Sequence, residues 1–153
     1  MVGDHFPDFS HWKVRAIETK IMELQPIAVH GSWSKKEPFS NLRKIESKNW
    51  DGPVAAITRA RIKWRMNRVF WRAVPAVNES LQKSPGLLRA IGIGEAPIGL
   101  QGTLSIWESG AALRDFAYRS SAHQEAIAAT ERIGWYSEEM FSRFAVIDES
   151  GDW

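Results

Sequence analysis

The chain of 153 residues contains no cysteine. Disulfide bonds, thiolate metal ligands and thiol nucleophiles are therefore excluded, and so is a thiolate-ligated haem. A haem iron in this protein would need a His or Tyr ligand, and the chain has four His and two Tyr. The composition thus leaves few residues that are able to hold iron.

Long apolar runs are also lacking, because no stretch of about eighteen or more apolar residues occurs. The N-terminal MVGDHFPDFSHW has acidic and aromatic residues where a secretory signal would have a basic and then an apolar segment. We therefore expect a soluble, cytoplasmic protein. The length and a hydrophobic content of 44% predict one globular domain with its own core.

Acidic residues are absent from one basic stretch in the middle of the chain. Its cations are Arg59, Arg61, Lys63, Arg65, Arg68 and Arg72. A solvated strand edge and helix face would explain such a stretch. Nucleic-acid binding is the other interpretation, but the strand expected in LQGTLSIWE lacks the paired exposed aromatics that stack bases in RNA-recognition sheets. We therefore expect no nucleic-acid partner.

Two parts of the chain differ in composition. Residues 20–29 predict a strand or an extended arm, in which Pro26 favours an edge or a bend. Residues 31–52 are rich in Gly, Ser, Lys, Asn and Pro, which is typical of a connecting loop. We therefore divide the chain into an N-terminal arm and linker at residues 1–52 and a compact domain at residues 53–153.

Strand and helix patterns alternate in the compact domain, separated by Gly and Pro. The expected elements are a strand at 54–62, a helix at 66–81, strands at 87–93 and 99–107, a helical region at 111–133 and a strand at 144–147. A break in the second helical region is indicated at Ser120–Ser121. The order β-α-β-β-α-β predicts an α+β fold with a ferredoxin-like unit, in which two helices cover one face of an antiparallel sheet.

The strand expected at 99–107 indicates what each face of the sheet carries. The aliphatic face has Ile98, Leu100, Leu104 and Ile106. The mixed face has Gln101, Thr103, Ser105 and Trp107. We expect the helices to cover the aliphatic face and Arg59 to lie on the mixed face. A mixed face suits a pocket or the interior of a barrel, which two units would have to close by meeting face to face.

Several ordered motifs between Gly52 and Phe144 are more specific. They are GPVAAITRA, FWRAVPAV, PGLLRAIGIGE, TLSIWES, FAYR, AHQEAI and GWYSEEMFSRF. Together with HGSWSKKEPF upstream and the final Gly151-Asp152-Trp153, they resemble the spheroidene monooxygenase family, mainly its C-terminal half. The resemblance covers most of the chain.

The resemblance implies a fold of the dimeric α+β barrel type, a monooxygenase that forms a ketone on an acyclic carotenoid, and a haem requirement. Family members carry a further ferredoxin-like half before the GSW motif, and about residues 6–33 stand for it here. We therefore expect a homodimer in which a second copy supplies the missing sheet. The expected substrate is an apolar isoprenoid or another hydrophobic small molecule, which peripheral membrane association would make accessible.

His123 is the candidate metal and cofactor ligand. Its spacings of seven from Phe116 and four from Ile127 place the three on one helical face, which would turn the imidazole toward the apolar side. A core histidine satisfied by a carbonyl is the alternative interpretation. If the helix breaks at Ser120–Ser121, His123 falls in the first turn of a new helix. His30 is the second choice of ligand.

Arg59 is the candidate catalytic and cofactor-binding cation, because a fixed guanidinium could pair with a haem propionate or polarise bound oxygen. An ion pair at the sheet edge is the alternative. Adjacent Glu138 and Glu139 are interpreted as solvated carboxylates on a helix. The candidate pocket residues combine polar strand residues with aromatics that could wall an isoprenoid, and they are Gln101, Thr103, Ser105, Trp107, Phe116, Trp135 and Tyr136.

Two other functions remain open. The chain could be a non-catalytic homodimeric protein that binds a small molecule in a hydrophobic pocket. It could also be an oxygenase of the same barrel class that needs no cofactor, which uses a substrate carbanion to activate oxygen. A carotenoid has no acidic C–H for that route, whereas a phenol or quinol would favour it.

Overall fold

The computed structural model describes residues 18–94, 99–119 and 121–152. Its strands are β1 (Thr19–Gly31), β2 (Val54–Ile62), β3 (Leu87–Gly94), β4 (Leu100–Trp107) and β5 (Tyr136–Asp152). Its α-helices are α2 (Asn67–Gln82), α3 (Gly110–Arg119) and α4 (Ser121–Ile133), and its short 3-10 helices are η1 (Ser47–Asn49) and η2 (Trp64–Met66). No helix in these ranges is long and apolar enough to cross a membrane.

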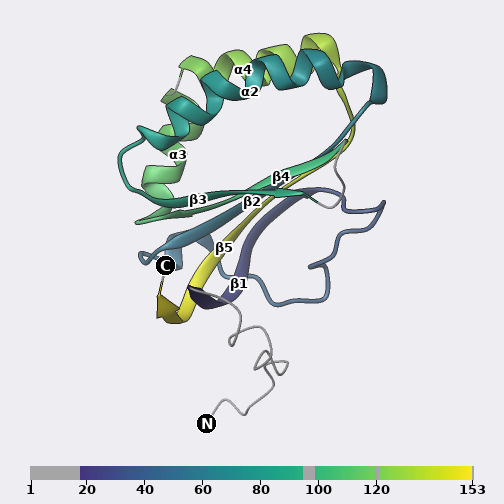
Figure 1. Cartoon of the computed structure of the whole chain (residues 1–153). Helices are drawn as coiled ribbons and strands as arrows, with labels where there is room; N and C mark the ends of the chain where they lie inside the picture. The colour runs from purple at the N-terminus through teal and green to yellow at the C-terminus, as the bar shows by residue number, and fades with distance from the viewer. Residues whose placement is uncertain (1–17, 95–98, 120, 153) are drawn as a thin grey trace.

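The five strands form one antiparallel sheet in the order β1-β5-β2-β4-β3, and the three α-helices lie over one of its faces (Figure 1). From β2 onward the elements follow the predicted β-α-β-β-α-β order, which confirms the ferredoxin-like α+β fold. β1 is added at the sheet edge by pairing with β5, from Thr19 opposite Asp152 to Gly31 opposite Met140. The N-terminal arm and the compact domain therefore share one sheet.

β5 is much longer than the strand predicted at residues 144–147. It pairs with β1 from Met140 to Asp152 and with β2 from Tyr136 to Ala145, so pairing with neighbouring strands stabilises it whatever side chains it carries. The interpretation of Glu138 and Glu139 as neighbours on a helix is therefore wrong. Successive side chains of a strand point to opposite faces, and accordingly Glu138 is half-buried while Glu139 is exposed.

The second helical region is divided, as the Ser120–Ser121 pair indicated. α3 ends at Arg119 and α4 begins at Ser121. The side-chain amide of Gln124 donates a hydrogen bond to the carbonyl oxygen of Tyr118, which satisfies a group that the end of α3 leaves without a helical partner. Phe116 and His123 thus belong to different helices. The prediction that they share one face is wrong, because a spacing of seven places residues together only within a continuous helix.

The helices cover the face opposite to the one we expected. Trp107 packs against Leu81 of α2 and Leu113 of α3, so the mixed face is the one beneath the helices. Leu104 and Ile106 lie on the other side of the sheet. A single buried Trp contributes a large apolar area to the contact between the helices and the sheet. The free energy gained by burying this area outweighs what the alternating aliphatic residues would contribute on that side.

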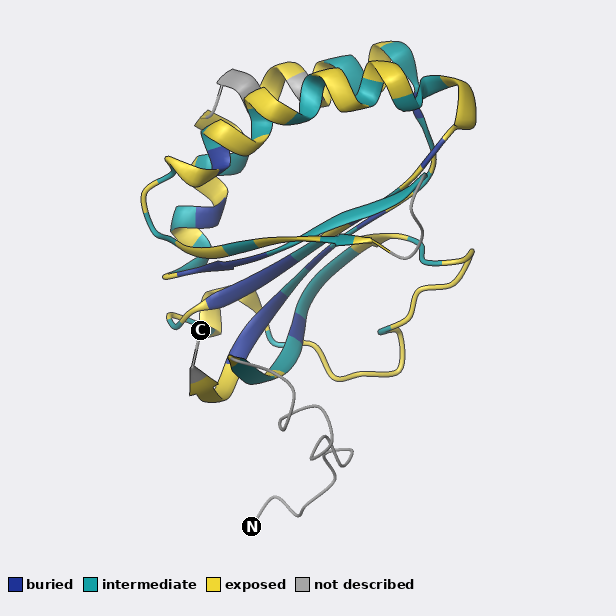
Figure 2. Ribbon diagram, in the orientation of Figure 1, coloured by how far each residue is buried: buried dark blue, intermediate teal, exposed yellow. Residues whose placement is uncertain are grey.

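The face of the sheet away from the helices, called here the open face, has an apolar cluster of its own. The cluster consists of Ala55, Ile106, Phe144 and Val146, with Met22, Leu24, Phe39, Ile57 and Leu104 packed against it. Phe39, from the loop after β1, meets the ring of Phe144 edge-on at 5.0 Å. Figure 2 shows that the buried positions follow the central strands. The core therefore has two layers, one on each side of the sheet.

Candidate functional site

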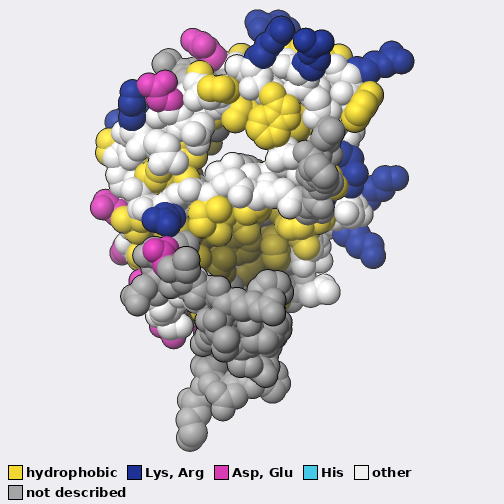
Figure 3. All heavy atoms as spheres, in the orientation of Figure 1, with side chains coloured by type: hydrophobic (Ala, Val, Ile, Leu, Met, Phe, Trp, Pro, Cys, Tyr) yellow, Lys and Arg dark blue, Asp and Glu magenta, His cyan; other side chains and the backbone are white. Residues whose placement is uncertain are grey.

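A hollow separates the helix layer from the middle of the sheet. Thr58 lies in the central strand β2 on the helix side, yet it is exposed. Its partner across the sheet, Thr103 of β4, is only half-buried. A central-strand residue stays exposed only where no side chain packs over it. Figure 3 shows the molecule hollowed between the helices and the sheet, and we call this space the cleft.

One end of the cleft is closed by a packed wall. Trp107 is fully buried, and its ring lies 5.3 Å from that of Phe116 on α3. The indole Nε1 of Trp107 donates a 2.9 Å hydrogen bond to Oγ of Ser105, so the buried hydroxyl has a partner. Gln101 lies further along β4 on the same face and is half-buried. The structure thus brings these predicted pocket residues to one side of the sheet.

The other end of the cleft is an aromatic cluster. The Trp135 ring lies 5.8 Å from Phe70 of α2 and 6.0 Å from Tyr136, and its Nε1 donates a 2.9 Å hydrogen bond to Oγ1 of Thr130 on α4. Burial and the nearby Glu139 carboxylate raise the pKa of the Tyr136 phenol, and hydrogen bonds offset this only in part. Tyr136 is therefore a neutral donor at neutral pH.

His123 lies in the first turn of α4, as the break between the helices requires. Position 123 precedes Ile127 by four residues and Thr130 by seven, so the three positions share a face of α4. Ile127 is 44% exposed, so the apolar side predicted from its spacing to His123 is not buried there. Thr130 contacts Trp135 at the cleft end. The side chain of His123 lies outside the described part of the structure, and His30 is exposed on β1. Across the described residues, no three His, Asp or Glu side chains converge as metal ligands.

Arg59 lies on the open face. Its partners across the sheet are Gly102 and Met140, whereas Thr103 pairs with Thr58 and faces the cleft. The sheet therefore separates Arg59 from the predicted pocket residues, and placing them in one cavity was wrong. The error is one residue in the strand register, which exchanges the two faces of a strand and is not specified by either strand alone.

The Arg59 guanidinium takes part in a buried ion pair. Its side chain is 2% exposed, and Nη1 lies 3.2 Å from Oε2 of Glu138. Arg61 is more exposed, and its Nε lies 3.7 Å from the same oxygen. The Trp33 ring centroid lies 4.6 Å from the Arg59 guanidinium carbon, which adds a cation–π contact. Arg59 thus forms an ion pair, as its alternative interpretation predicted. The pair is buried on the sheet and does not lie at the sheet edge.

Glu138 also holds a strained turn in the HGSWSKKEPF segment, directly after Trp33. Ser34 and Lys35 have φ values of 53° and 63°, between the paired backbones of Trp33 and Lys36. Left-handed backbone costs a non-glycine residue roughly 1–2 kcal/mol. Oε1 of Glu138 accepts a hydrogen bond of 2.6 Å from the Lys35 backbone N–H and one of 2.9 Å from the Ser32 hydroxyl. These bonds fix the turn to the sheet despite its strain.

The same contacts keep Glu138 ionised. The backbone N–H of Lys35 contributes most, and the Ser32 hydroxyl, the Arg59 guanidinium and the Ser34 backbone add to it, while burial opposes them. Together they lower the pKa of Glu138 from 4.5 to about 2. The pair is therefore charged on both sides throughout the physiological range.

The sequence did not predict Glu138 and Trp33 as partners of Arg59, nor Ser32 as a hydrogen-bond donor to Glu138. If the segment around Glu138 is read as a strand, the side chains of Glu138 and Glu139 point to opposite faces of the sheet. Glu138 can then pair across the sheet with an Arg of the strand at 54–62. The HGSW motif was noted only for its resemblance to a family. Its role as a cap over the ion pair depends on the path of the loop after β1, which no local pattern specifies.

Three relatives of this chain are named spheroidene monooxygenase. The chain is 36% identical to that of Rhodobacter capsulatus over 152 residues, which is 99% of this chain and 63% of the relative. It is 34% identical to that of Cereibacter sphaeroides over 149 residues, 96% of this chain and 45% of the relative. For Rubrivivax gelatinosus the values are 37% over 142 residues, 93% and 53%. The chain thus spans between 45% and 63% of these relatives' length.

Solved structures show the same fold at low sequence identity. A putative monooxygenase from Fusobacterium nucleatum matches 86% of this chain and 52% of its own, with a TM-score of 0.59 and 11% identity. A putative antibiotic biosynthesis monooxygenase from Caulobacter crescentus matches 64% and 92%, with a TM-score of 0.55 and 13% identity. A mutant form of SnoaB, a cofactor-independent oxygenase from Streptomyces nogalater, matches 63% and 95%, with a TM-score of 0.53 and 12% identity.

No family model matches the chain. The sequence likeness nevertheless extends over almost all of this chain in each of the three relatives. The fold is shared with solved structures described as putative monooxygenases. The chain therefore resembles the spheroidene monooxygenases in sequence, and it shares the ferredoxin-like α+β fold with these solved structures.

Proposed function

We propose that this chain acts as a monooxygenase on an apolar small molecule that lies in the cleft between the helix layer and the sheet. The observation that carries the proposal is the exposure of Thr58 at the centre of the sheet. Protein interiors are close-packed, so uncovered sheet beneath a helix layer is space kept for a ligand. The likeness to spheroidene monooxygenases supports oxygenation as the reaction.

The lining of the cleft suits a substrate with few polar groups. Aromatic side chains close both ends, with Phe116 at one and Trp135 and Tyr136 at the other. The half-buried Gln101 and Thr103 add a few hydrogen-bonding groups to the floor. An isoprenoid such as a carotenoid would be held mainly by contact with the aromatic rings, and the neutral Tyr136 phenol could orient one oxygen of a partly oxidised substrate.

The residues present fit a haem in part. His123 is on the helix that roofs the cleft and would be the residue that holds the haem iron, and a bound haem would supply the activation of dioxygen. Arg59 does not fit the role of propionate partner, because the sheet lies between it and the cleft and Glu138 already engages it. We therefore keep His123 in the haem proposal and assign Arg59 to the open face.

Titration of the purified protein with haemin tests the cofactor part of the proposal. We expect a stoichiometric Soret band that is lost in His123→Ala and kept in His30→Ala, an exposed histidine on β1. A Thr58→Phe variant should weaken the band, because the new ring would occupy the floor of the cleft. A well-folded protein without a Soret band, or equal bands in both histidine variants, would remove His123 and haem from the proposal.

A second copy of the chain is the proposed partner of the open face. Leu24, Ile57 and Leu104 are only half-buried there, around an apolar cluster. Sheets of this kind can close into a barrel only by meeting a second sheet. Light scattering should give the mass of a dimer for the natural chain and of a monomer for Leu104→Glu. Leu88→Glu, at an exposed position of β3, is the matched control and should stay dimeric.

A haem-free oxygenase or a non-catalytic homodimeric binding protein is the second candidate. The position of Arg59 favours it, because the cation expected to hold a haem propionate is directed away from the cleft. Such a protein would bind an apolar molecule in the same cleft without a Soret band. Binding of a fluorescent hydrophobic probe that Thr58→Phe abolishes and His123→Ala leaves unchanged would support this function over the haem enzyme.

A further inference from the structure

A cationic surface with exposed indoles surrounds η2 and the first half of α2. We call it the basic face, and it consists of Lys63, Trp64, Arg65, Arg68, Trp71 and Arg72, all of them exposed. Trp64 is 76% exposed and Trp71 is 46% exposed, beside Val69 at 40%. Large apolar side chains that are exposed together and bordered by charged residues mark an interaction surface. The function proposed above makes no use of this surface.

The charge on this surface is of one sign. No Asp or Glu occurs between Asp51 and Glu79. Within the described ranges, Arg65, Arg68 and Arg72 make no ion pair. Figure 3 shows Lys and Arg side chains gathered around the end of the helix layer where α2 begins, while the visible Asp and Glu lie mainly toward the other end. The positive electrostatic potential of the basic face favours an anionic partner.

We infer that the basic face docks on the surface of an anionic lipid bilayer. Guanidinium groups pair with lipid phosphates, and each Lys or Arg near an anionic membrane adds to the attraction. Trp side chains favour the boundary between headgroups and acyl chains, where one end of the indole is apolar and its N–H is hydrated. A nucleic acid would satisfy the cations equally well, but it offers Trp64, Val69 and Trp71 no apolar layer.

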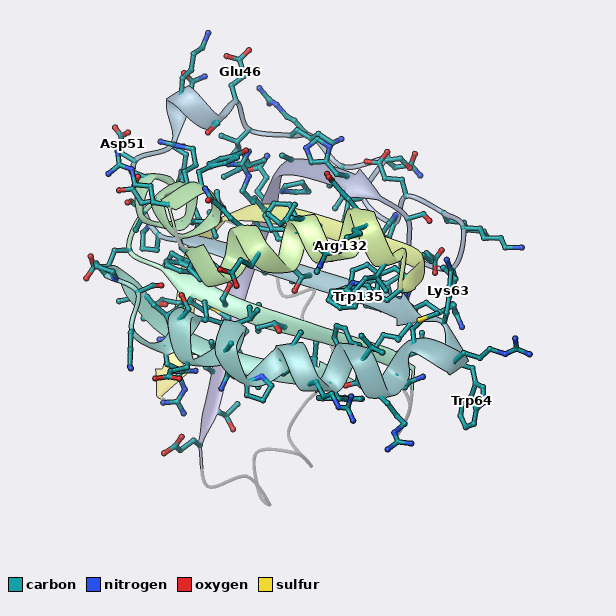
Figure 4. The ribbon with its side chains drawn as sticks, turned by 90° about the horizontal axis from the view of Figure 1, so that it is seen from above. Glu46, Asp51, Lys63, Trp64, Arg132 and Trp135 are labelled. Carbon is teal, nitrogen blue, oxygen red and sulfur yellow. The ribbon has the colours of Figure 1, made fainter. Side chains whose placement is uncertain are left out.

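The basic face adjoins the aromatic end of the cleft. The backbone N–H of Lys63 donates a 2.8 Å hydrogen bond to the Trp135 carbonyl oxygen, and Nζ of Lys63 donates one to the carbonyl oxygen of Gly134 at 2.5 Å. Figure 4 shows Lys63 beside Trp135, and Trp64 pointing away from the body of the protein. A protein docked through this face would hold the Trp135 end of its cleft near the bilayer, where apolar molecules dissolve.

Co-sedimentation of the full chain with vesicles tests this inference. We expect binding to vesicles of phosphatidylcholine mixed with phosphatidylglycerol, and weak binding to phosphatidylcholine alone or at high salt. The triple variant R65E/R68E/R72E should bind the mixed vesicles at least about 100-fold more weakly, since each cation near an anionic surface contributes about fivefold. W64A/W71A should lose about tenfold or more through its apolar contact.

The matched controls change the same charge and the same kind of side chain elsewhere. K36E/K48E/R114E reverses three exposed cations on other segments, and Y118A removes a 71%-exposed aromatic from α3. Both should bind as the natural chain does, and circular dichroism would confirm that all variants fold. Equal losses in the control and basic-face triples, or no binding to mixed vesicles, would overturn the inference, as would tight binding of duplex DNA or RNA without vesicle binding. Vesicle binding involves no catalysis, so its failure would leave the oxygenase proposal as it stands.

Discussion

The two faces of the sheet are formed by the same strands but differ in how their side chains pack. On the helix side, the largest aromatic residues pack around Trp107 and around Trp135, and Thr58 in the middle is exposed beside the half-buried Phe141. On the open face, an apolar cluster around Phe144 fills one part and a buried ion pair occupies another. One face is thus built around a space and the other around a fixed charge pair.

From this difference we expect the helix side of the sheet to bind a ligand and the open face to stabilise the fold. A space with few polar groups suits an apolar ligand, whereas a fully engaged Arg59–Glu138 pair fixes the loop after β1 to the sheet. If this division is right, changes on the open face should affect stability and its pH dependence. Changes at the middle of the cleft should affect binding instead.

Trp107→Ala should have the largest effect on stability. The side chain is fully buried between Leu81, Leu113 and Phe116, so its removal leaves a cavity in the helix-side wall. We expect a loss of about 3–5 kcal/mol in the free energy of unfolding, measured with urea. Thr58→Ala in the open middle of the same face is the control, with an expected change within about 0.5 kcal/mol. Similar losses at both positions would show that the middle of the cleft is packed.

Arg59→Met should be the next most destabilising change. It leaves the Glu138 carboxylate without its main counter-charge beneath Trp33, and a buried charge without a partner is costly. We expect the melting temperature to fall by at least about 5 °C. The double variant Arg59→Met/Glu138→Gln should recover part of that loss. If the single variant melts as the natural chain does, the pair does not fix the open face.

The pH dependence of stability should report Glu138 separately. Its pKa is lowered from 4.5 to about 2 on folding, so its contribution is fully present above pH 4.5 and is lost as the pH falls toward 2. The difference in melting temperature between the natural chain and Glu138→Gln should therefore shrink across this window. Glu139→Gln, at the exposed neighbour, is the charge-matched control. A constant difference down to about pH 2 would contradict the lowered pKa.

The sequence predicted the elements better than their relation to one another. The strand at 54–62 and the α+β unit follow from alternation and from punctuation by Gly and Pro, which are local signals. The length of β5 escaped prediction because its polar start at Ser137–Glu139 has no strand-like hydrophobic pattern. It is a strand because Ala60 and Arg61 of β2 pair with Glu139 and Glu138, and that is a tertiary effect.

The sequence did not predict how the candidate site residues are arranged. Trp107, Phe116, Trp135 and Tyr136 lie on the helix side of the sheet, and their role in binding stays a prediction. Arg59 was assigned to the wrong face, since one residue of register between β2 and β4 reverses the assignment and neither strand fixes it alone. The role of His123 stays a prediction.

Two buried serines, one on each face of the sheet, should give the smallest of these effects on stability. Ser105 on the helix side accepts the Trp107 indole N–H, whereas the Ser142 hydroxyl on the open face has no hydrogen-bond partner among the described residues. Removing a used acceptor leaves the indole N–H unsatisfied, so Ser105→Ala should lose about 1–3 kcal/mol. Ser142→Ala should be neutral or gain up to about 1 kcal/mol, because it removes a hydroxyl that pays a desolvation penalty without compensation. Urea unfolding of the two variants decides this, and a loss at Ser142 equal to that at Ser105 would mean that the open face holds a partner for this hydroxyl, such as a second copy of the chain.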